Sequence, residues 1–203
     1  MQKMNDTLKT IYERRAIRKF KDKAVDKKII EQLIDAGRMA PSAINHQPWK
    51  FYVVTKKEDI QLFSKEITKS AIKSIPKMGV KNIVKAVASG ITHITHLSQG
   101  IDFMKAPDPV FHGAPVIIFI TAPSDNEWAS LDIGMCAQNI MLTAKSLGLD
   151  SCPVGFAKFV MQAKSYSKLK IPKNERVIIS VIIGYGDETP EIHERKKDNV
   201  IYI

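Results

Sequence analysis

The spacing of apolar residues near the N-terminus predicts two helices and then a strand. Apolar side chains recur at helical intervals from Lys3 to Glu13 and again after Asp26. Asp26 is a favourable N-cap for the second helix, and Pro41 ends it. A short strand is predicted at Phe51 to Val54.

The second half of the chain contains two unbroken apolar runs, from Pro115 to Ala122 and from Val177 to Gly184. Such runs are typical of strands covered on both faces. Between them, Ser124-Asp125-Asn126 is a candidate cap for a helix that is apolar nearly all round, ends at Gly148 and must be buried. A strand resumes at Ser151 to Val154. The elements alternate too irregularly for a doubly wound sheet.

The middle of the chain, Lys56 to Pro109, predicts two or three basic amphipathic helices, interrupted at Pro76 and Gly79. We expect this region to face the substrate. The length of 203 residues and the hydrophobic content of 44% fit a single domain over residues 1–203. No apolar stretch approaches the roughly 20 residues that span a membrane. The first ten residues lack the apolar core of a secretion signal, so a cytoplasmic location is the default.

The net charge of +10 favours anionic partners, which include nucleic acid, anionic lipid and phosphorylated cofactors. The lysines are spread along the chain, however, and a dispersed basic surface is usually only solvated. The two cysteines, Cys136 and Cys152, have neither CxxC nor metal-ligand spacing. We therefore expect neither a disulfide nor a metal site. Cys152 could act as a nucleophile, but its flank follows an apolar helix and resembles a strand that enters the core, so we interpret it as a packed thiol.

Common nucleotide motifs are missing from the sequence, because it has no P-loop and the pair Gly184 and Gly186 lacks a third glycine. Side-chain cations must then hold any phosphate. Arg14, Arg15 and Arg18 lie within one turn at the end of the first predicted helix and could grip an anion. Their spacing alone favours a simpler interpretation, a solvated basic helix end.

The segment from Pro41 to Trp49 carries the densest polar chemistry. Ser42, Asn45 and Gln47 offer groups that both donate and accept, as the edge of a fused heterocycle with ring nitrogens and carbonyls requires. The commoner explanation of such a segment is an ordinary turn whose side chains satisfy its own backbone.

Five segments taken together resemble, in chain order, the motifs of the FMN-dependent nitroreductase family. They are Arg14 to Arg18, Ala40 to Phe51, His112 to Val116, Asp132 to Cys152, and Ile183 to Gly186. The pattern Pro-Ser-x-x-Asn-x-Gln-Pro-Trp is the most specific of them.

The resemblance implies an α+β fold, with a mixed central sheet surrounded by helices, and an intertwined homodimer with FMN in two clefts at its interface. It assigns no catalytic side chain and no metal ligand. It assigns cofactor binding to Arg14, Arg15, Arg18 and Arg195 around the phosphate and ribityl chain, to Pro41, Ser42, Ala43, Asn45 and Gln47 of the other chain, and to Pro153, Val154 and Gly155 beside the isoalloxazine ring.

The implied activity is hydride transfer from NADH or NADPH through FMN to a small electron-poor acceptor, nitroaromatic or quinone-like, by a ping-pong mechanism. Nucleic acid and membranes are not expected partners. Alternatives are other flavin chemistry on the same fold (dehalogenation, flavin fragmentation, heterocycle oxidation) or a basic non-enzymatic nucleic-acid-binding protein. Two positions depart from the family: Ala16 stands where a serine is usual, and no acidic residue adjoins Gly155.

Overall fold

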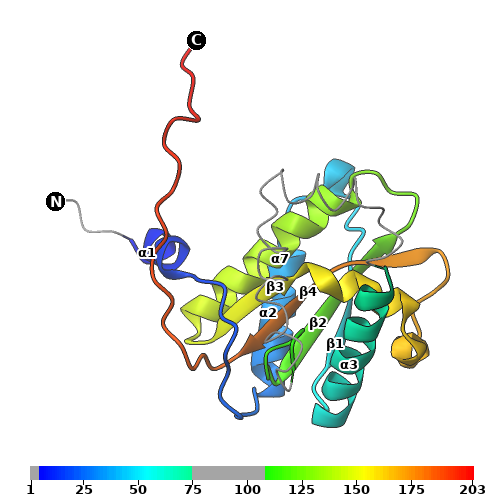
Figure 1. Cartoon of the computed structure of the whole chain (residues 1–203). Helices are drawn as coiled ribbons and strands as arrows, with labels where there is room; N and C mark the ends of the chain where they lie inside the picture. The colour runs from blue at the N-terminus through cyan, green and yellow to red at the C-terminus, as the bar shows by residue number, and fades with distance from the viewer. Residues whose placement is uncertain (1–4, 75–107) are drawn as a thin grey trace.

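The computed structural model describes residues 5–74 and 108–203, in which four strands form one sheet (Figure 1). The strands, in their spatial order, are β1 (Lys50–Val54), β2 (Val116–Pro123), β4 (Glu175–Gly184) and β3 (Asp150–Val154). All three ladders between neighbouring strands are antiparallel. The parallel component of the expected mixed sheet is confined, within the described ranges, to an isolated bridge between Ala16 and Ser151. The reason is topological: β2 and β3 run parallel to each other, but β4 lies between them.

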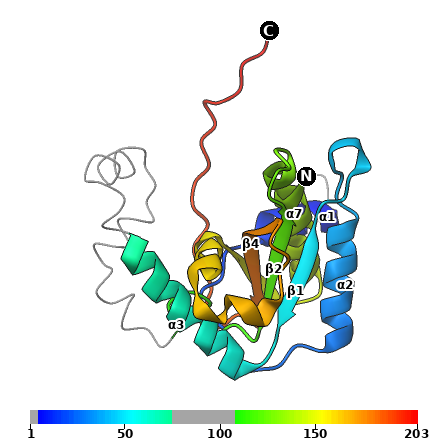
Figure 2. The same ribbon diagram turned by 90° about the vertical axis from the view of Figure 1, so that its right-hand side faces the viewer.

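Helices cover both faces of this sheet, and Figure 2 shows α2 and α3 on opposite sides of it. The described α-helices are α1 (Asp6–Glu13), α2 (Lys27–Arg38), α3 (Lys57–Ser74) and α7 (Ala129–Ser146). Three 3₁₀ segments complete the regular structure: η1 (Ala43–Asn45), η2 (Gly155–Gln162) and η3 (Lys164–Leu169).

Strand β2 confirms the prediction of a doubly covered strand. Its side chains alternate, so that Ile117 and Phe119 pack with α3 and η2, while Ile118 and its alternate neighbours pack with α2 and α7. Both sets are buried because each face of the sheet carries helices. The continuous apolar run is therefore the expected sequence for this strand, and β4 follows the same rule.

Helix α7 was predicted correctly in type but not at its start. It begins at Ala129 after an N-cap, Trp128, that makes no side-chain capping bond. The candidate cap residues instead form the preceding turn, in which Asn126 Oδ1 accepts the Trp128 N–H at 2.9 Å. The helix ends as predicted, before Gly148, whose φ of +74° suits glycine. Leu131 remains 57% exposed, so the helix is not buried all round.

The two N-terminal helices follow the predictions at most of their ends. Helix α1 begins at Asp6 after the cap Asn5, which accepts the Leu8 N–H, and it ends at Glu13 as predicted; the expected start at Lys3 lies outside the described residues. Asp26 caps α2 as predicted, by accepting the Lys28 N–H at 2.7 Å. In the middle of the chain, α3 confirms the first predicted helix, and residues 75–107 lie outside the described residues. No helix in the part that is described is long and apolar enough to cross a membrane.

Candidate functional site

The residues from Arg14 to Phe20, here called the arginine segment, run along the outer edge of β3 and not on a helix as predicted. Arg14 leaves α1 with a ψ of 132°, which is not helical. The Ile17 N–H then donates to the Ser151 carbonyl at 3.1 Å, and Phe20 forms a bridge with Gly186. Pairing with the sheet overrides helix continuation here, because it satisfies the backbone groups of the segment.

The guanidinium of Arg14 is buried at one nitrogen, Nη1, which has no hydrogen-bond partner in the described structure. Burial lowers the pKa of Arg14, the Cys152 thiol opposes that effect, and the neighbouring cations Arg15 and Arg195 lower it further. Arg195 therefore lies near Arg14 within a single chain, as the resemblance implied. A buried, unpaired guanidinium beside further cations is suited to an anion.

Arg15 and Arg18 are fixed differently. Arg15 donates to two carbonyls, those of Tyr12 at 2.6 Å and Arg14 at 2.8 Å. The backbone N–H of Arg18 donates to the Glu188 carboxylate, which sequence analysis did not single out. Glu188 follows the Gly184-Tyr185-Gly186 turn, and the bridge between Phe20 and Gly186 brings it here. Only long-range pairing reveals that contact.

His112 lies in the same neighbourhood and is partly buried in a left-handed conformation, with φ at 56°. Burial lowers its pKa, Asp108 and Glu188 oppose this, and the cationic Arg18 adds to it. His112 begins one of the segments that resemble the family motifs, and the resemblance assigns it no role. A neutral imidazole is favoured as long as no further anion occupies this neighbourhood.

Pro153, Val154 and Gly155 stand at the end of β3 and the start of η2, on the strand that the arginine segment borders. Pro153 and Gly155 are exposed and Val154 is buried. Cys152, just before them, is buried, and burial raises its pKa against the opposing charges of Arg18 and Arg14. The structure thus brings these two predicted groups of residues together.

The residues from Pro41 to Gln47, here called the amide loop, are held by their own side chains. Ser42 Oγ accepts the Gln47 N–H at 2.9 Å, and Gln47 Nε2 donates to Asn45 Oδ1 at 3.1 Å. Ile44, Asn45 and Gln47 all have positive φ, at 48°, 57° and 47°. Non-glycine residues in this region carry strain of about 1–3 kcal/mol each, and such strain clusters at functional sites.

The amide loop rests on α7 through Asp132, which begins one of the segments that resemble the family motifs but was given no role there. Asp132 Oδ1 accepts the Ala43 N–H at 3.2 Å. Its other oxygen, Oδ2, is buried and has no partner within residues 5–74 and 108–203. Only the helical register of α7 and the fold of the loop bring the two residues together, so no local pattern indicated this contact.

A single chain does not bring the arginine segment and the amide loop together. The loop leads into β1, which is one edge of the sheet, whereas the arginine segment borders β3, the other edge. Two β-strands, β2 and β4, separate them. The two groups therefore occur as separate halves in this chain.

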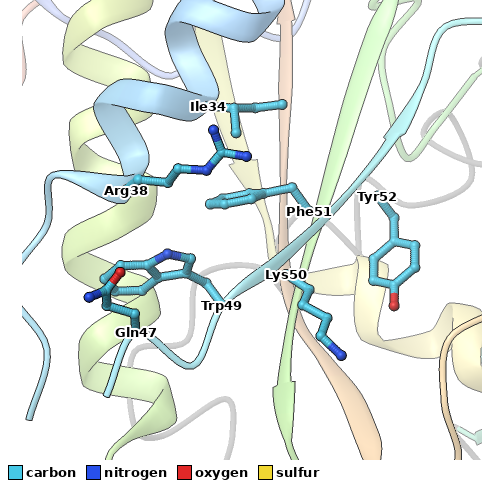
Figure 3. A pocket seen from close by; sticks show the side chains of 7 residues that line it. All are labelled: Ile34, Arg38, Gln47, Trp49, Lys50, Phe51 and Tyr52. Carbon is cyan, nitrogen blue, oxygen red and sulfur yellow. The ribbon is translucent and has the colours of Figure 1, made fainter. Parts of the chain in front are cut away.

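An open depression lies over β1, and Figure 3 shows the side chains that line it. The Arg38 guanidinium lies over the Phe51 ring and pairs with Asp35. Lys50, farther along the strand, pairs with the buried carboxylate of Glu175. Both cations are thus matched by carboxylates, so this depression lacks the unpaired charge that distinguishes Arg14.

Comparison with known proteins identifies the family of the chain. The model of the nitroreductase family matches residues 11–185. The chain is 28% identical to a 4-nitrobenzoate reductase of Pseudomonas putida over 89% of its length and 85% of the relative's. It is 27% identical to a nitrobenzene nitroreductase of Ectopseudomonas oleovorans, over 88% and 86% of the two chains.

A solved structure gives the same result in three dimensions. The crystal structure of a nitroreductase with bound FMN from Desulfitobacterium hafniense DCB-2 superposes with a TM-score of 0.76 at 27% identity, over 98% of this chain and 99% of that one. The expected α+β nitroreductase fold is confirmed. On the match across residues 11–185, the chain belongs to the nitroreductase family.

Proposed function

We propose that this protein is an FMN-dependent oxidoreductase that passes hydride from NADH or NADPH to a small electron-poor acceptor. The observation that carries the proposal is the buried, unpartnered Nη1 of Arg14 beside Arg15 and Arg195. The FMN phosphate is a dianion with several acceptor oxygens, and a cluster of guanidinium groups matches it in charge and geometry.

The residues present fit the cofactor. Across the described residues, no ion pair neutralises Arg14, Arg15, Arg18 or Arg195. The backbone of the arginine segment is fixed by the Ile17 hydrogen bond to Ser151 and the bridge of Phe20 with Gly186, so the backbone of Arg14, Arg15 and Arg18 is positioned before any ligand arrives. Ala16 stands where a serine is usual, and its backbone forms the bridge with Ser151. The neighbouring residues must supply the hydroxyl contact to the phosphate that the alanine lacks.

FMN, when bound, accepts hydride from one substrate and returns it to the next. The protein positions and shields that chemistry. Arg14, Arg15, Arg18 and Arg195 hold the phosphate end, and the exposed backbone of Pro153 and Gly155, next to the buried Val154, lies beside the ring. In the amide loop of a second chain, Pro41 and Ala43 shape the backbone, while Ser42, Asn45 and Gln47 exchange their internal hydrogen bonds for contacts with the polar ring edge. One cleft that serves both substrates in turn gives ping-pong kinetics.

A nitroaromatic compound is the proposed class of acceptor, with quinone-like compounds as the nearest alternative. The names of the relatives from Pseudomonas putida and Ectopseudomonas oleovorans support this choice. Both named substrate types are planar and electron-poor, and such a molecule can stack on a flavin in an open cleft. The proposal does not depend on a catalytic side chain, because the cofactor supplies the reactive atoms.

We further propose a homodimer in which each flavin site takes one half from each chain. The amide loop and the arginine segment lie at opposite edges of the sheet in one chain, so a second copy is needed to complete the site. Exposed apolar groups are available for such an interface. Leu131 and Met135 of α7 line a shallow groove beside Pro41, and Tyr202 in the C-terminal tail is 93% exposed.

The test begins with the colour of the purified protein and its capacity for FMN. We expect a yellow protein, or a colourless one that becomes yellow after incubation with FMN and gel filtration. Under anaerobic conditions NADH or NADPH should bleach the bound flavin, and 4-nitrobenzoate should restore its absorbance. A protein that retains no FMN after reconstitution would contradict the proposal. Bleaching without reoxidation would refute only the proposed acceptor.

Dilution tests the shared site. FMN should leave the protein in step with dissociation of the dimer, and added FMN should shift the balance back toward the dimer by mass action. Sedimentation followed at the flavin absorbance measures both at once. A monomer that retains its flavin at every concentration would show that one chain is sufficient.

A further inference from the structure

The buried carboxyl group of Asp132 is not among the groups proposed to contact FMN. Asp132 is only 1% exposed and lies in the first turn of α7. One of its oxygens accepts the Ala43 N–H, and the other has no partner among the residues that the structure describes. Burying a carboxyl group with half of its acceptors unused carries a desolvation cost, so such a residue calls for a specific explanation.

The contact with Ala43 is the one hydrogen bond that ties the amide loop to another element within residues 5–74 and 108–203. The remaining hydrogen bonds of the loop are internal, including those from Gln47 N–H to Ser42 Oγ and from Asn45 N–H to the Ser42 carbonyl. Three residues of the loop have positive φ. A strained backbone persists only where its surroundings hold it, and Asp132 adds the hydrogen bond from outside the loop to the bonds that the loop makes within itself.

The support beneath Asp132 is rigid. Helices α2 and α7 pack so closely that a Cβ added to Gly37 would lie 2.9 Å from Ile140 Cγ1. Asn139 Nδ2 also donates to the Ala36 carbonyl at 3.2 Å, which ties α7 to the end of α2 just before the loop. Asp132 therefore connects a strained loop to a fixed pair of helices.

We propose that Asp132 is a positioning residue of the flavin site, which holds the Pro41–Gln47 loop in the conformation that presents Ser42, Asn45 and Gln47 to FMN. This inference rests on the proposed function. Asp132 acts through the loop and does not itself touch the cofactor. Without Asp132, the loop relaxes to unstrained backbone angles. FMN binding must then order the loop, and the entropy lost in that step weakens the affinity.

The experiment compares Asp132→Ala, Asp132→Asn and a control, Ser64→Ala. Ser64 is also buried with an unpartnered side-chain oxygen, but it lies in α3 on the opposite face of the sheet. Hydrogen exchange of peptides covering residues 41–49 in flavin-free protein measures how firmly the loop is held. Quenching of flavin fluorescence measures the Kd for FMN, and circular dichroism reports folding.

We expect Asp132→Ala to speed exchange in the loop and to weaken FMN binding by about 10- to 100-fold, as loss of a hydrogen bond to a carboxyl group predicts. Asp132→Asn keeps an acceptor for the Ala43 N–H and should lose less than about tenfold. If the alanine variant does not fold, Asp132→Asn provides the test. Ser64→Ala should change neither quantity.

A double-mutant cycle separates positioning from general stability. In an Asn45→Ala background, Asp132→Ala should weaken FMN binding much less than in the wild type, because a loop contact that it positions is already absent. Additive effects would overturn the proposal, as would unchanged exchange in residues 41–49, or faster exchange with an unchanged Kd. If the wild-type protein itself binds no FMN, the proposed function fails, and that failure is visible before any variant is made.

Discussion

The arginine segment and the amide loop solve the same problem, fixing a piece of chain at the edge of a sheet, by opposite means. The arginine segment is fixed by its backbone, which pairs with Ser151 and Gly186, so Arg14 keeps an unpaired guanidinium nitrogen. The amide loop has no pairing strand. It is fixed by side chains, with Asn45 and Gln47 bonded to each other and Asp132 holding it from below.

The difference indicates how the two halves contribute to binding. None of the guanidinium groups proposed to bind the phosphate has a carboxylate partner in the described residues, so an anion gives each of them a charge-assisted bond without breaking an ion pair, and we expect them to supply most of the affinity. The side chains of the loop must exchange their internal hydrogen bonds for hydrogen bonds to the ligand, which yields little net energy. A ligand whose donors and acceptors do not match leaves these groups unsatisfied and is therefore strongly disfavoured. We therefore assign affinity mainly to the arginine half and selectivity mainly to the amide half.

The largest effect should follow from separating the two halves. Deleting residues 198–203 removes the apolar end of the tail but leaves Arg195 in place. The C-terminal end of the chain extends away from the body of one chain in Figure 1, and the side chains of Ile201 and Tyr202 are 85% and 93% exposed. If they pack on the second chain, the dimer dissociation constant should rise by at least about 100-fold, since each buried side chain contributes about 1.5–3 kcal/mol.

Sedimentation at several concentrations measures this change, and bound flavin should fall with it. Lys196→Ala is the matched control, because it alters the tail without removing apolar surface. A truncated protein that remained a dimer with its full flavin complement would show that the end of the tail is dispensable. It would also contradict the proposal that the tail packs on the second chain.

The second effect concerns the arginine half alone. Arg14→Ala should weaken FMN binding by about one to two powers of ten, the range expected for one charge-assisted hydrogen bond to phosphate, while the chain stays folded. Arg176→Ala is the control, since Arg176 is an exposed arginine on β4 and its loss changes the net charge equally. Fluorescence titration with FMN compares the two. Equal losses would indicate a general charge effect and remove Arg14 from the site.

The elements of the fold were predictable because their signals are local. Unbroken apolar runs located β2 and β4, and Asp26 and Gly148 marked the ends of helices by their own conformational preferences. The start of α7 was placed too early, since Asn126 is a good cap residue whose side chain is used in a turn. The antiparallel order of the strands depends on β4 entering between β2 and β3, which no local pattern encodes.

The site divides in the same way. The resemblance selected Arg14 and Arg195, and the structure places them near each other although 180 positions of sequence separate their segments. Asp132 and Glu188 were missed because their roles exist only through contacts with Ala43 and Arg18, far away in the sequence. The helical interpretation of the arginine segment was wrong because pairing with Ser151, and not intrinsic propensity, decides the backbone there.

The third effect uses two buried thiols as probes of the two halves. Cys136 lies in α7 four residues after Asp132, and burial raises its pKa to about 12 from an ordinary 9.0. A group whose pKa is raised by folding contributes stability below its unfolded pKa, and this contribution is lost as the pH rises to its folded pKa. The free energy of unfolding should therefore fall, because of Cys136, by about 1.4 kcal/mol per pH unit between pH 9.0 and about 12. Cys136→Ala should remove that slope.

Cys152 lies beside the arginine half, where Arg18 and Arg14 oppose the rise in its pKa. Its stability loss should therefore end at a lower pH and be smaller in total than that of Cys136, and Cys152→Ala should remove this smaller loss. Denaturant unfolding at several pH values from 8 to 11 gives the free energies. Equal total losses from the two thiols over this range would contradict the opposing effect of the arginines on Cys152.

The smallest effect tests the strain in the amide half. Ile44 is 94% exposed and holds φ at 48°, a conformation that costs a β-branched residue about 1–2 kcal/mol more than glycine. Ile44→Gly removes this strain, loses no packing and adds some entropy to the unfolded chain, so it should raise the free energy of unfolding by about 0.5–1 kcal/mol. Ile11→Gly, at an exposed position in α1 with ordinary helical angles, should instead lower it by about 0.5 kcal/mol. Denaturant melts of both variants, made below the concentration at which dimers form, give the comparison. A loss of stability in Ile44→Gly would mean that the loop is not strained in the free chain, and the contrast between a backbone-held half and a side-chain-held half would lose its energetic basis.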